Sequence, residues 1–265
     1  MKSKKLKVGI FDSGLGGLTV LSSLQKVLKG AEVFYIADTK NAPYGGKTFQ
    51  QILQYSLDIT QYFITHHQID ALIIACNTAT SAAIKILREK YSELIILGTE
   101  PGVKPAIKQT KTGNIGVLAT PATLRGEKYQ QLVDSFTHGE TICLHEQACP
   151  GLVEQIEKGE VHSLETREML TSWLEPMKQN NVDTIVLGCT HYPLVSELIK
   201  RIMQRDINLI ETGDAIARHL LTCAKSKGHN NSGDLTLNLY ATQSVNVDVV
   251  KTLFVNDYKM STITI

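Results

Sequence analysis

Two cysteines end matching stretches of this sequence. Residues 69–76 read IDALIIAC and residues 182–189 read VDTIVLGC, so each apolar run leads through one small residue to a thiol, Cys76 or Cys189. A strand buried in a parallel sheet has this composition and would present the thiol at its carboxyl end. Two thiols on opposite sides of one carbon centre could take a proton from one face of a substrate and return one to the other. The pair therefore indicates proton-transfer chemistry.

Polar residues follow both cysteines. They are Asn77 and Thr78 after the first thiol, and Thr190 and His191 after the second. Their side chains are able to hold a carboxylate or to stabilise a thiolate. A helix that begins just after either cysteine would also favour the thiolate, because the amino-terminal end of a helix carries partial positive charge.

Two turns elsewhere in the sequence could also meet a ligand. Residues 12–17 read DSGLGG, and their glycines allow a tight turn close to a bound molecule. Asp12 could pair with an ammonium group there, while Ser13 donates to a carboxylate. A dinucleotide-binding turn fits less well, because the third glycine is missing at the required spacing. In the polar loop of residues 38–47, Tyr44 and the backbone of Gly45 could lie over a ligand.

Other interpretations of the cysteines meet difficulties. A zinc site on Cys189 and His191 would need two more ligands, and the remaining spacing fits no compact zinc motif. A cysteine hydrolase needs a histidine ordered beside its nucleophile. If both residues lie on one strand end, His191 is badly placed to aim its ring at the sulfur, and Cys76 has no role. The other cysteines are expected to be small buried apolar residues: Cys143, Cys149 and Cys223.

Strand-like and helix-like segments alternate along the chain, which predicts parallel sheets covered by helices. Strands are expected at 7–11, 32–37, 71–75 and 94–97, and helices at 18–28, 48–66, 81–89 and 215–225. The alternation of strands and helices begins again at residue 114. The apolar pattern of residues 7–13 recurs there, at an offset close to the separation between the two cysteines. We therefore expect an α/β protein of two similar parallel-sheet domains with a pseudo-twofold relation. Glycine and proline mark the crossovers, so the expected domains are 1–97 plus 213–265, and 98–212.

The composition excludes several classes of protein. The 265 residues are 43% hydrophobic and 20% charged with a net charge of +1, so nothing indicates a nucleic-acid partner. No run of about 18 apolar residues is present, so no membrane span is expected. The lysine-rich start lacks the continuous apolar stretch of a signal peptide. Five cysteines without Cys-x-x-Cys spacing are typical of a reducing compartment, so we expect a cytoplasmic protein.

Four motifs together resemble a known family. The segments 12–14, 43–45, 75–79 and 188–193 are similar, in order, to motifs of bacterial glutamate racemases, which belong to the aspartate/glutamate racemase superfamily. The resemblance implies conversion of L-glutamate to D-glutamate for peptidoglycan without a cofactor or a metal. It also implies an active site in the cleft between two α/β domains, and a homodimer. Two alternatives stay open, a racemase of aspartate or another small acid and a cysteine-dependent hydrolase or isomerase.

The same resemblance implies roles for individual residues. Cys76 and Cys189 match the two proton-transfer residues, and Asp38 and Glu157 match carboxylates near the thiols. Assistance to the thiols is expected from Asp12 or Asp38 in one half and from His191 in the other. The substrate-binding pairs implied are Asp12 with Ser13, Tyr44 with Gly45, Asn77 with Thr78, and Thr190 with His191.

Overall fold

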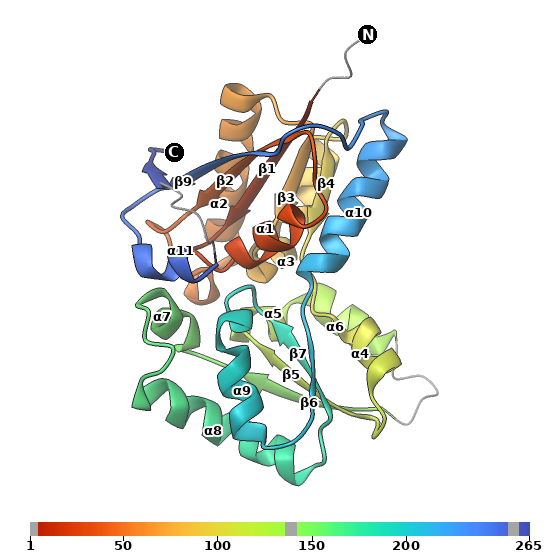
Figure 1. Ribbon diagram of the computed structural model, residues 1–265, viewed down its shortest axis with the longest axis vertical. Helices are drawn as coiled ribbons and strands as arrows, with labels where there is room; N and C mark the ends of the chain where they lie inside the picture. The colour runs from red at the N-terminus through yellow and green to blue at the C-terminus, as the bar shows by residue number, and fades with distance from the viewer. Residues whose placement is uncertain (1–4, 136–141, 254–259) are drawn as a thin grey trace. The chain divides into compact units, whose positions relative to one another are not determined.

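The computed structural model describes residues 5–135, 142–253 and 260–265. Its chain forms two compact units, the first made of Met1–Thr99 and Gly213–Ile265 and the second of Glu100–Thr212. Each unit contains a parallel β-sheet with helices packed against it (Figure 1).

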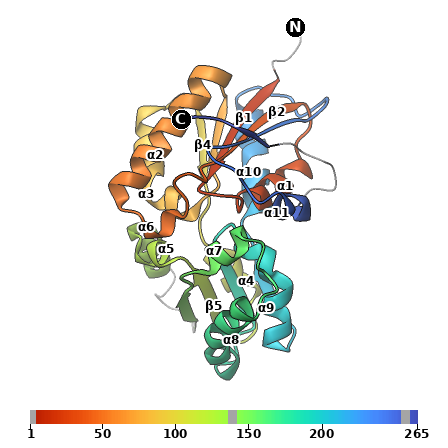
Figure 2. The same cartoon turned by 90° about the vertical axis from the view of Figure 1, so that its left-hand side faces the viewer.

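The first unit is built on a sheet of six described strands in the order β10-β9-β2-β1-β3-β4, and every pairing in it is parallel. Figure 2 shows this sheet between α2 and α3 on one side and α1, α10 and α11 on the other. The strands are β1 (Leu6–Asp12), β2 (Ala31–Ala37), β3 (Ala71–Ile74), β4 (Ile95–Gly98), β9 (Thr236–Ala241) and β10 (Met260–Thr262). The helices are α1 (Leu18–Gln25), α2 (Phe49–Tyr62), α3 (Asn77–Lys90), α10 (Gly213–Ser226) and α11 (Val247–Leu253), with a 3-10 turn at Tyr44–Gly46 and a π-helical turn at Phe63–His67.

Alternation along the strands explains the two covered faces of this sheet. Phe11, Ile36 and Ile74 belong to the core that also contains the buried residues of α2 and α3. Because neighbouring residues of a strand point to opposite faces, Tyr35 lies on the side of α1, and its side chain is fully buried. A capping box of Thr48 and Gln51 starts α2, as each side chain bonds to the backbone of the other residue.

The second unit has a sheet of four described strands in the order β6-β5-β7-β8, again with parallel pairings. One face packs against α7, α8 and α9 through residues such as Leu118 and Leu187, and the other packs against α4 and α6 through Val117 and Val186. The strands are β5 (Asn114–Ala119), β6 (Cys143–Ala148), β7 (Thr184–Gly188) and β8 (Asn208–Ile210). The helices are α4 (Val103–Gln109), α5 (Pro121–Arg125), α6 (Glu127–Asp134), α7 (Leu152–Glu157), α8 (Leu164–Gln179) and α9 (Ser196–Met203), with a 3-10 turn at Tyr192–Val195.

The two sheets share one internal order. In the first unit the strands run β2-β1-β3-β4, and in the second the corresponding strands run β6-β5-β7-β8. The order reverses beside the first strand of each unit, where open α/β sheets bind ligands at the carboxyl ends of their strands. The predicted pair of parallel-sheet α/β domains is confirmed, and both cysteines follow the third strand of their own unit.

Three expected helix boundaries differ by three or more residues from those in the structure. The helix expected at 18–28 ends at Gln25, and the helix expected at 48–66 gives way at Phe63 to a π-helical turn. The helix expected from residue 81 begins earlier, at Asn77, immediately after Cys76. This last difference matters for the site, because it places a helix amino terminus at the thiol.

Candidate active site

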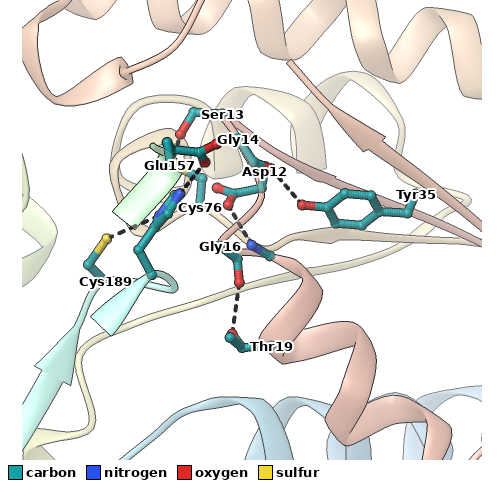
Figure 3. A network of polar contacts seen from close by, with 11 residues as sticks. Asp12, Ser13, Gly14, Gly16, Thr19, Tyr35, Cys76, Glu157 and Cys189 are labelled. Atoms are coloured by element: carbon teal, nitrogen blue, oxygen red, sulfur yellow. Dashed lines mark hydrogen bonds and ion pairs between the residues drawn. The ribbon is translucent and has the colours of Figure 1, made fainter. Parts of the chain in front are cut away.

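Hydrogen bonds made by three side chains help to hold the turn after β1 (Figure 3). Asp12 Oδ2 accepts from the Gly17 N–H at 2.6 Å, and the buried Tyr35 hydroxyl donates to the Gly14 carbonyl at 2.7 Å. The Thr19 hydroxyl donates to the carbonyl of Gly16 at 2.8 Å. Asp12 is therefore fixed at the strand end, and the backbone of the turn is tied to the next strand and to α1.

Gly17 provides a test of how closely this turn is packed. A Cβ atom at this position would lie 2.7 Å from the Asp12 Cβ and 3.0 Å from both the Ala75 Cβ and the Tyr35 hydroxyl. We expect Gly17→Ala to lower the free energy of unfolding by about 1–3 kcal/mol, since the crowded groups must shift. Urea titration measures this change. The matched control is Gly46→Ala, where a Cβ meets nothing within 4 Å, and equal losses in the two variants would contradict the packing argument.

Cys76 lies two residues after the end of β3 and serves as the N-cap of α3. Its sulfur accepts from the Ala79 N–H at 3.4 Å and lies 3.7 Å from the Ser13 hydroxyl oxygen. The side chain is buried, at 6% exposure, and the next two residues, Asn77 and Thr78, form the buried first turn of the helix. Because the start of a helix carries partial positive charge, this position favours a thiolate.

Asp38 and Tyr44 form a buried hydrogen-bonded pair in the loop after β2. The Tyr44 hydroxyl donates to Asp38 Oδ2 at 2.6 Å. Burial, followed by the negative charge of Asp38, raises the pKa of Tyr44 well above its usual value, with smaller effects from Cys76 and Asp12. Tyr44 is therefore a neutral hydrogen-bond donor near Cys76 and Asp12. Gly45 follows it in the 3-10 turn. The structure thus brings together the predicted residues of the first unit.

In the second unit, Cys189, His191 and Glu157 form a chain of contacts (Figure 3). The Cys189 sulfur lies 3.7 Å from His191 Nδ1, and His191 Nε2 lies 2.5 Å from Glu157 Oε1. The expectation that His191 is badly placed toward Cys189 is wrong, because β7 ends at Gly188. The chain then turns, with the Tyr192 N–H donating to the Cys189 carbonyl at 3.1 Å, and this turn brings the imidazole back to the sulfur.

The charge of His191 is set by its two neighbours. Burial alone would lower the pKa of this imidazole, but its contacts with Cys189 and with the Glu157 carboxylate raise the pKa well above its usual value. These contacts favour the imidazolium form of the ring, which lies between a sulfur and a carboxylate. It can give a proton to Cys189, while Thr190, which is also buried, lies between them in the chain.

The remaining cysteines only partly follow expectation. Cys149 is buried beside the Tyr192 hydroxyl near Cys189, and burial raises its pKa to about 12, so it stays an unreactive thiol. Cys143 was expected to be buried, but it is exposed on the edge strand β6, and Cys223 is only partly buried. An edge strand has one open side, so an apolar residue type there does not imply burial.

The described residues contain neither a metal-binding cluster nor a membrane-spanning helix. Within residues 5–135, 142–253 and 260–265, no group of three or more His, Cys, Asp or Glu side chains is placed to hold a metal ion. Among the helices of the same segments, none has both the length and the apolar character needed to cross a membrane.

Comparisons with known proteins place this chain and its fold in one class. A family model described as Asp/Glu/Hydantoin racemase matches residues 16–220, and the chain belongs to this family. It is therefore an enzyme of the isomerase class, a racemase. The resemblance found in the sequence motifs is confirmed.

Individual relatives cover nearly the whole chain. A protein named glutamate racemase from Sulfurovum sp. (strain NBC37-1) is 63% identical over 93% of both chains. A second protein of that name, from Aliarcobacter butzleri (strain RM4018), is 59% identical over 95% of this chain and 96% of its own. Among solved structures, a glutamate racemase isoform from Bacillus anthracis is 29% identical with a TM-score of 0.85, over 99% of this chain and 98% of that one.

Proposed function

We propose that the protein interconverts L-glutamate and D-glutamate without a cofactor, using Cys76 and Cys189 as the two proton-transfer groups. The observation that carries the proposal is the matched position of the two thiols. Each follows the third strand of its own parallel sheet, and each has a polar partner at 3.7 Å, Ser13 or His191. The names of the closely similar relatives support glutamate as the substrate.

The substrate has three charged groups, and the first unit offers partners for them. Asp12 is an anionic partner for the substrate ammonium. The Ser13 and Tyr44 hydroxyls, the N–H of Gly45 and the first turn of α3 at Asn77 and Thr78 are suited to carboxylates. We assign Thr190 and His191 to the same role beside Cys189.

In the proposed reaction one sulfur is a thiolate and the other a thiol when the substrate binds. The thiolate takes the Cα proton, the bonding electron pair spreads into the α-carboxylate, and the opposite thiol gives its proton to the other face of Cα. One S–H bond forms and one breaks, so no net proton is gained or lost. Hydrogen-bond donors near the α-carboxylate stabilise the charge that builds on it. The roles of the sulfurs reverse for the other enantiomer, so the two thiols should titrate as a coupled pair.

The family resemblance and the composition also support a proposal about the cellular role and the location of the enzyme. D-Glutamate would serve peptidoglycan synthesis, the enzyme would act in the cytoplasm as a homodimer, and no nucleic acid or membrane would take part. Free cysteines at all five positions support a reducing compartment.

Isotope incorporation tests the proposed function. In deuterated water, L-glutamate should yield D-glutamate that carries one deuterium at Cα, because the incoming proton comes from a thiol in exchange with solvent. Mass spectrometry measures the deuterium content of the product, and circular dichroism measures the formation of D-glutamate. Activity should survive dialysis against a chelator, and a requirement for added metal or pyridoxal phosphate would reject the mechanism. We expect aspartate, one methylene shorter, to react roughly 10–200-fold less efficiently.

One observation favours a second candidate function. The series Cys189, His191 and Glu157 also matches the nucleophile, base and orienting acid of a cysteine hydrolase. Such an enzyme would form a covalent adduct on Cys189 and would need no second thiol. Intact-protein mass spectrometry during turnover distinguishes the two, since a racemase of the proposed kind gains no mass.

A further inference from the structure

The loop between β2 and α2 is tied to a distant part of the chain. Its first residue, Asp38, is almost fully buried, and its carboxylate accepts hydrogen bonds from three side chains. Tyr44 donates to Oδ2 at 2.6 Å, and Thr242 donates to Oδ1 at 2.8 Å. The amide of Asn41 lies 3.1 Å from Oδ1 and 3.0 Å from Oδ2. Each carboxylate oxygen thus already has two donors.

Thr242 directly follows β9, the strand that the last part of the chain adds beside β2. Besides its bond to Asp38, its hydroxyl oxygen accepts from the Lys40 N–H at 3.0 Å. The next residue, Gln243, exchanges two bonds with Thr39, because the Thr39 hydroxyl donates to its carbonyl and accepts from its N–H, each at 3.0 Å. We call Thr242 and Gln243 the β9 clasp.

The position of the clasp follows from the sheet register. Ala37 pairs with Ala241 in the parallel β2–β9 ladder, so both strands end at the same level. The Thr242 N–H then donates to the Ala37 carbonyl at 3.0 Å, and the Asp38 N–H donates to the Asp12 carbonyl at 2.9 Å. The ends of three neighbouring strands, β1, β2 and β9, therefore lie together at one edge of the sheet.

Loss of the Thr242 hydroxyl would have a defined consequence. A buried carboxylate that loses one of its charge-assisted hydrogen bonds must turn toward its remaining donors or admit water. Tyr44 depends on the same carboxylate, so its hydroxyl would move with it. Because Tyr44 is held at the far end of a short loop, Gly45 would be displaced as well.

We infer that Thr242 is a positioning residue for the substrate-binding loop, acting through Asp38 on Tyr44, and that Asp38 is an anchor of this loop instead of a proton-transfer group. The inference rests on the proposed function, since it assigns the loop to substrate binding. It gives a functional role to Thr242, which lies in the carboxyl-terminal part of the chain.

The decisive variant is Thr242→Val, which removes the hydroxyl with little change of shape. We expect the KM for glutamate to rise roughly 10-fold, as for the loss of a hydrogen bond to a charged group, with kcat changed less than about 2-fold. Thr242→Ser retains the hydroxyl and should restore the parent KM. The matched control is Thr236→Val at the other end of β9, where the hydroxyl of this exposed residue accepts a bond from exposed Lys5.

Two further measurements separate the role of the clasp from a general loss of stability. Tyr44→Phe should raise KM, and combining it with Thr242→Val should raise KM less than the product of the single effects, because both act through Asp38. Thr39→Val opens the clasp from the loop side and should resemble Thr242→Val. An unchanged KM in Thr242→Val, or an equal rise in Thr236→Val, would overturn the inference.

Amide hydrogen exchange tests the β9 clasp in the absence of substrate. In Thr242→Val the amide of Lys40 loses its acceptor, so exchange in residues 38–47 should quicken at least about 10-fold, while Thr236→Val leaves it unchanged. Parent exchange rates in Thr242→Val would disprove the clasp. A parent enzyme that fails to racemise glutamate would instead disprove the proposed function, so the two failures are distinguishable.

Discussion

Replacing Cys76 with alanine should reduce racemisation of both glutamate enantiomers by at least about 10³-fold, the scale of a lost proton-transfer group. Each direction uses both sulfurs, one as base and one as acid, so neither enantiomer should escape the effect. Circular dichroism at equal enzyme concentration measures both rates. Cys189→Ala should give the same loss, since the two thiols are equivalent in the proposed reaction.

The controls for this prediction come from the other cysteines and from serine. Cys143 is exposed on the edge of the second sheet, so Cys143→Ala should keep the parent rate. Cys76→Ser should also stop racemisation, but it should retain one-way exchange or elimination with an analogue that needs only the remaining thiol. If Cys76→Ala racemises glutamate at the parent rate, the two-thiol mechanism is wrong.

Glu157→Gln should lower kcat by about 10²-fold at alkaline pH, and less at acid pH. In the parent enzyme the carboxylate and Cys189 hold the pKa of His191 above its usual value against the effect of burial. Without the carboxylate, less remains to offset the lowering of the His191 pKa by burial. The pKa therefore falls, and the imidazolium loses its proton at a lower pH. The alkaline limb of the kcat profile should therefore move toward lower pH.

A control and a stability measurement accompany this prediction. Glu154→Gln changes an exposed carboxylate on the same helix and should leave the profile in place. Because the folded state raises the pKa of His191, its stabilising effect is complete below about pH 6.5 and is lost as the pH rises through the folded value. In Glu157→Gln the free energy of unfolding should decline less over that range. Identical pH profiles in parent and Glu157→Gln would show that His191 does not depend on this carboxylate.

The sequence predicted those parts of the fold and site that depend on local pattern. Apolar runs predicted the strands β1 to β5 and β7, and the ends of such strands drew attention to Asp12, Cys76 and Cys189, since parallel strands deliver such residues to one edge. The early start of α3 was not predictable from capping rules, because its N-cap is a thiol and the favoured N-caps are Ser, Thr, Asp and Asn.

Other features depend on contacts that a local pattern does not contain. The approach of His191 to Cys189 depends on where β7 stops, because a fully extended chain would hold residues i and i+2 roughly 6.6 Å apart along the strand. The buried hydroxyl of Tyr35 can be located only once its register beside β1 is known. No local sequence pattern marks Thr242 as a functional residue, because its partner Asp38 lies 204 positions away.

The same separation has a consequence during protein synthesis. Residues 100–212 are contiguous in the sequence, whereas the outer edge of β2 gains its partner strand only after β9 has been synthesised. At about 5–20 residues per second, the interval between emergence of Asp38 and Thr242 is on the order of 10–40 s. Throughout translation of the second unit, the nascent first sheet therefore exposes an unpaired strand edge, the kind of surface that chaperones cover and that aggregation exploits.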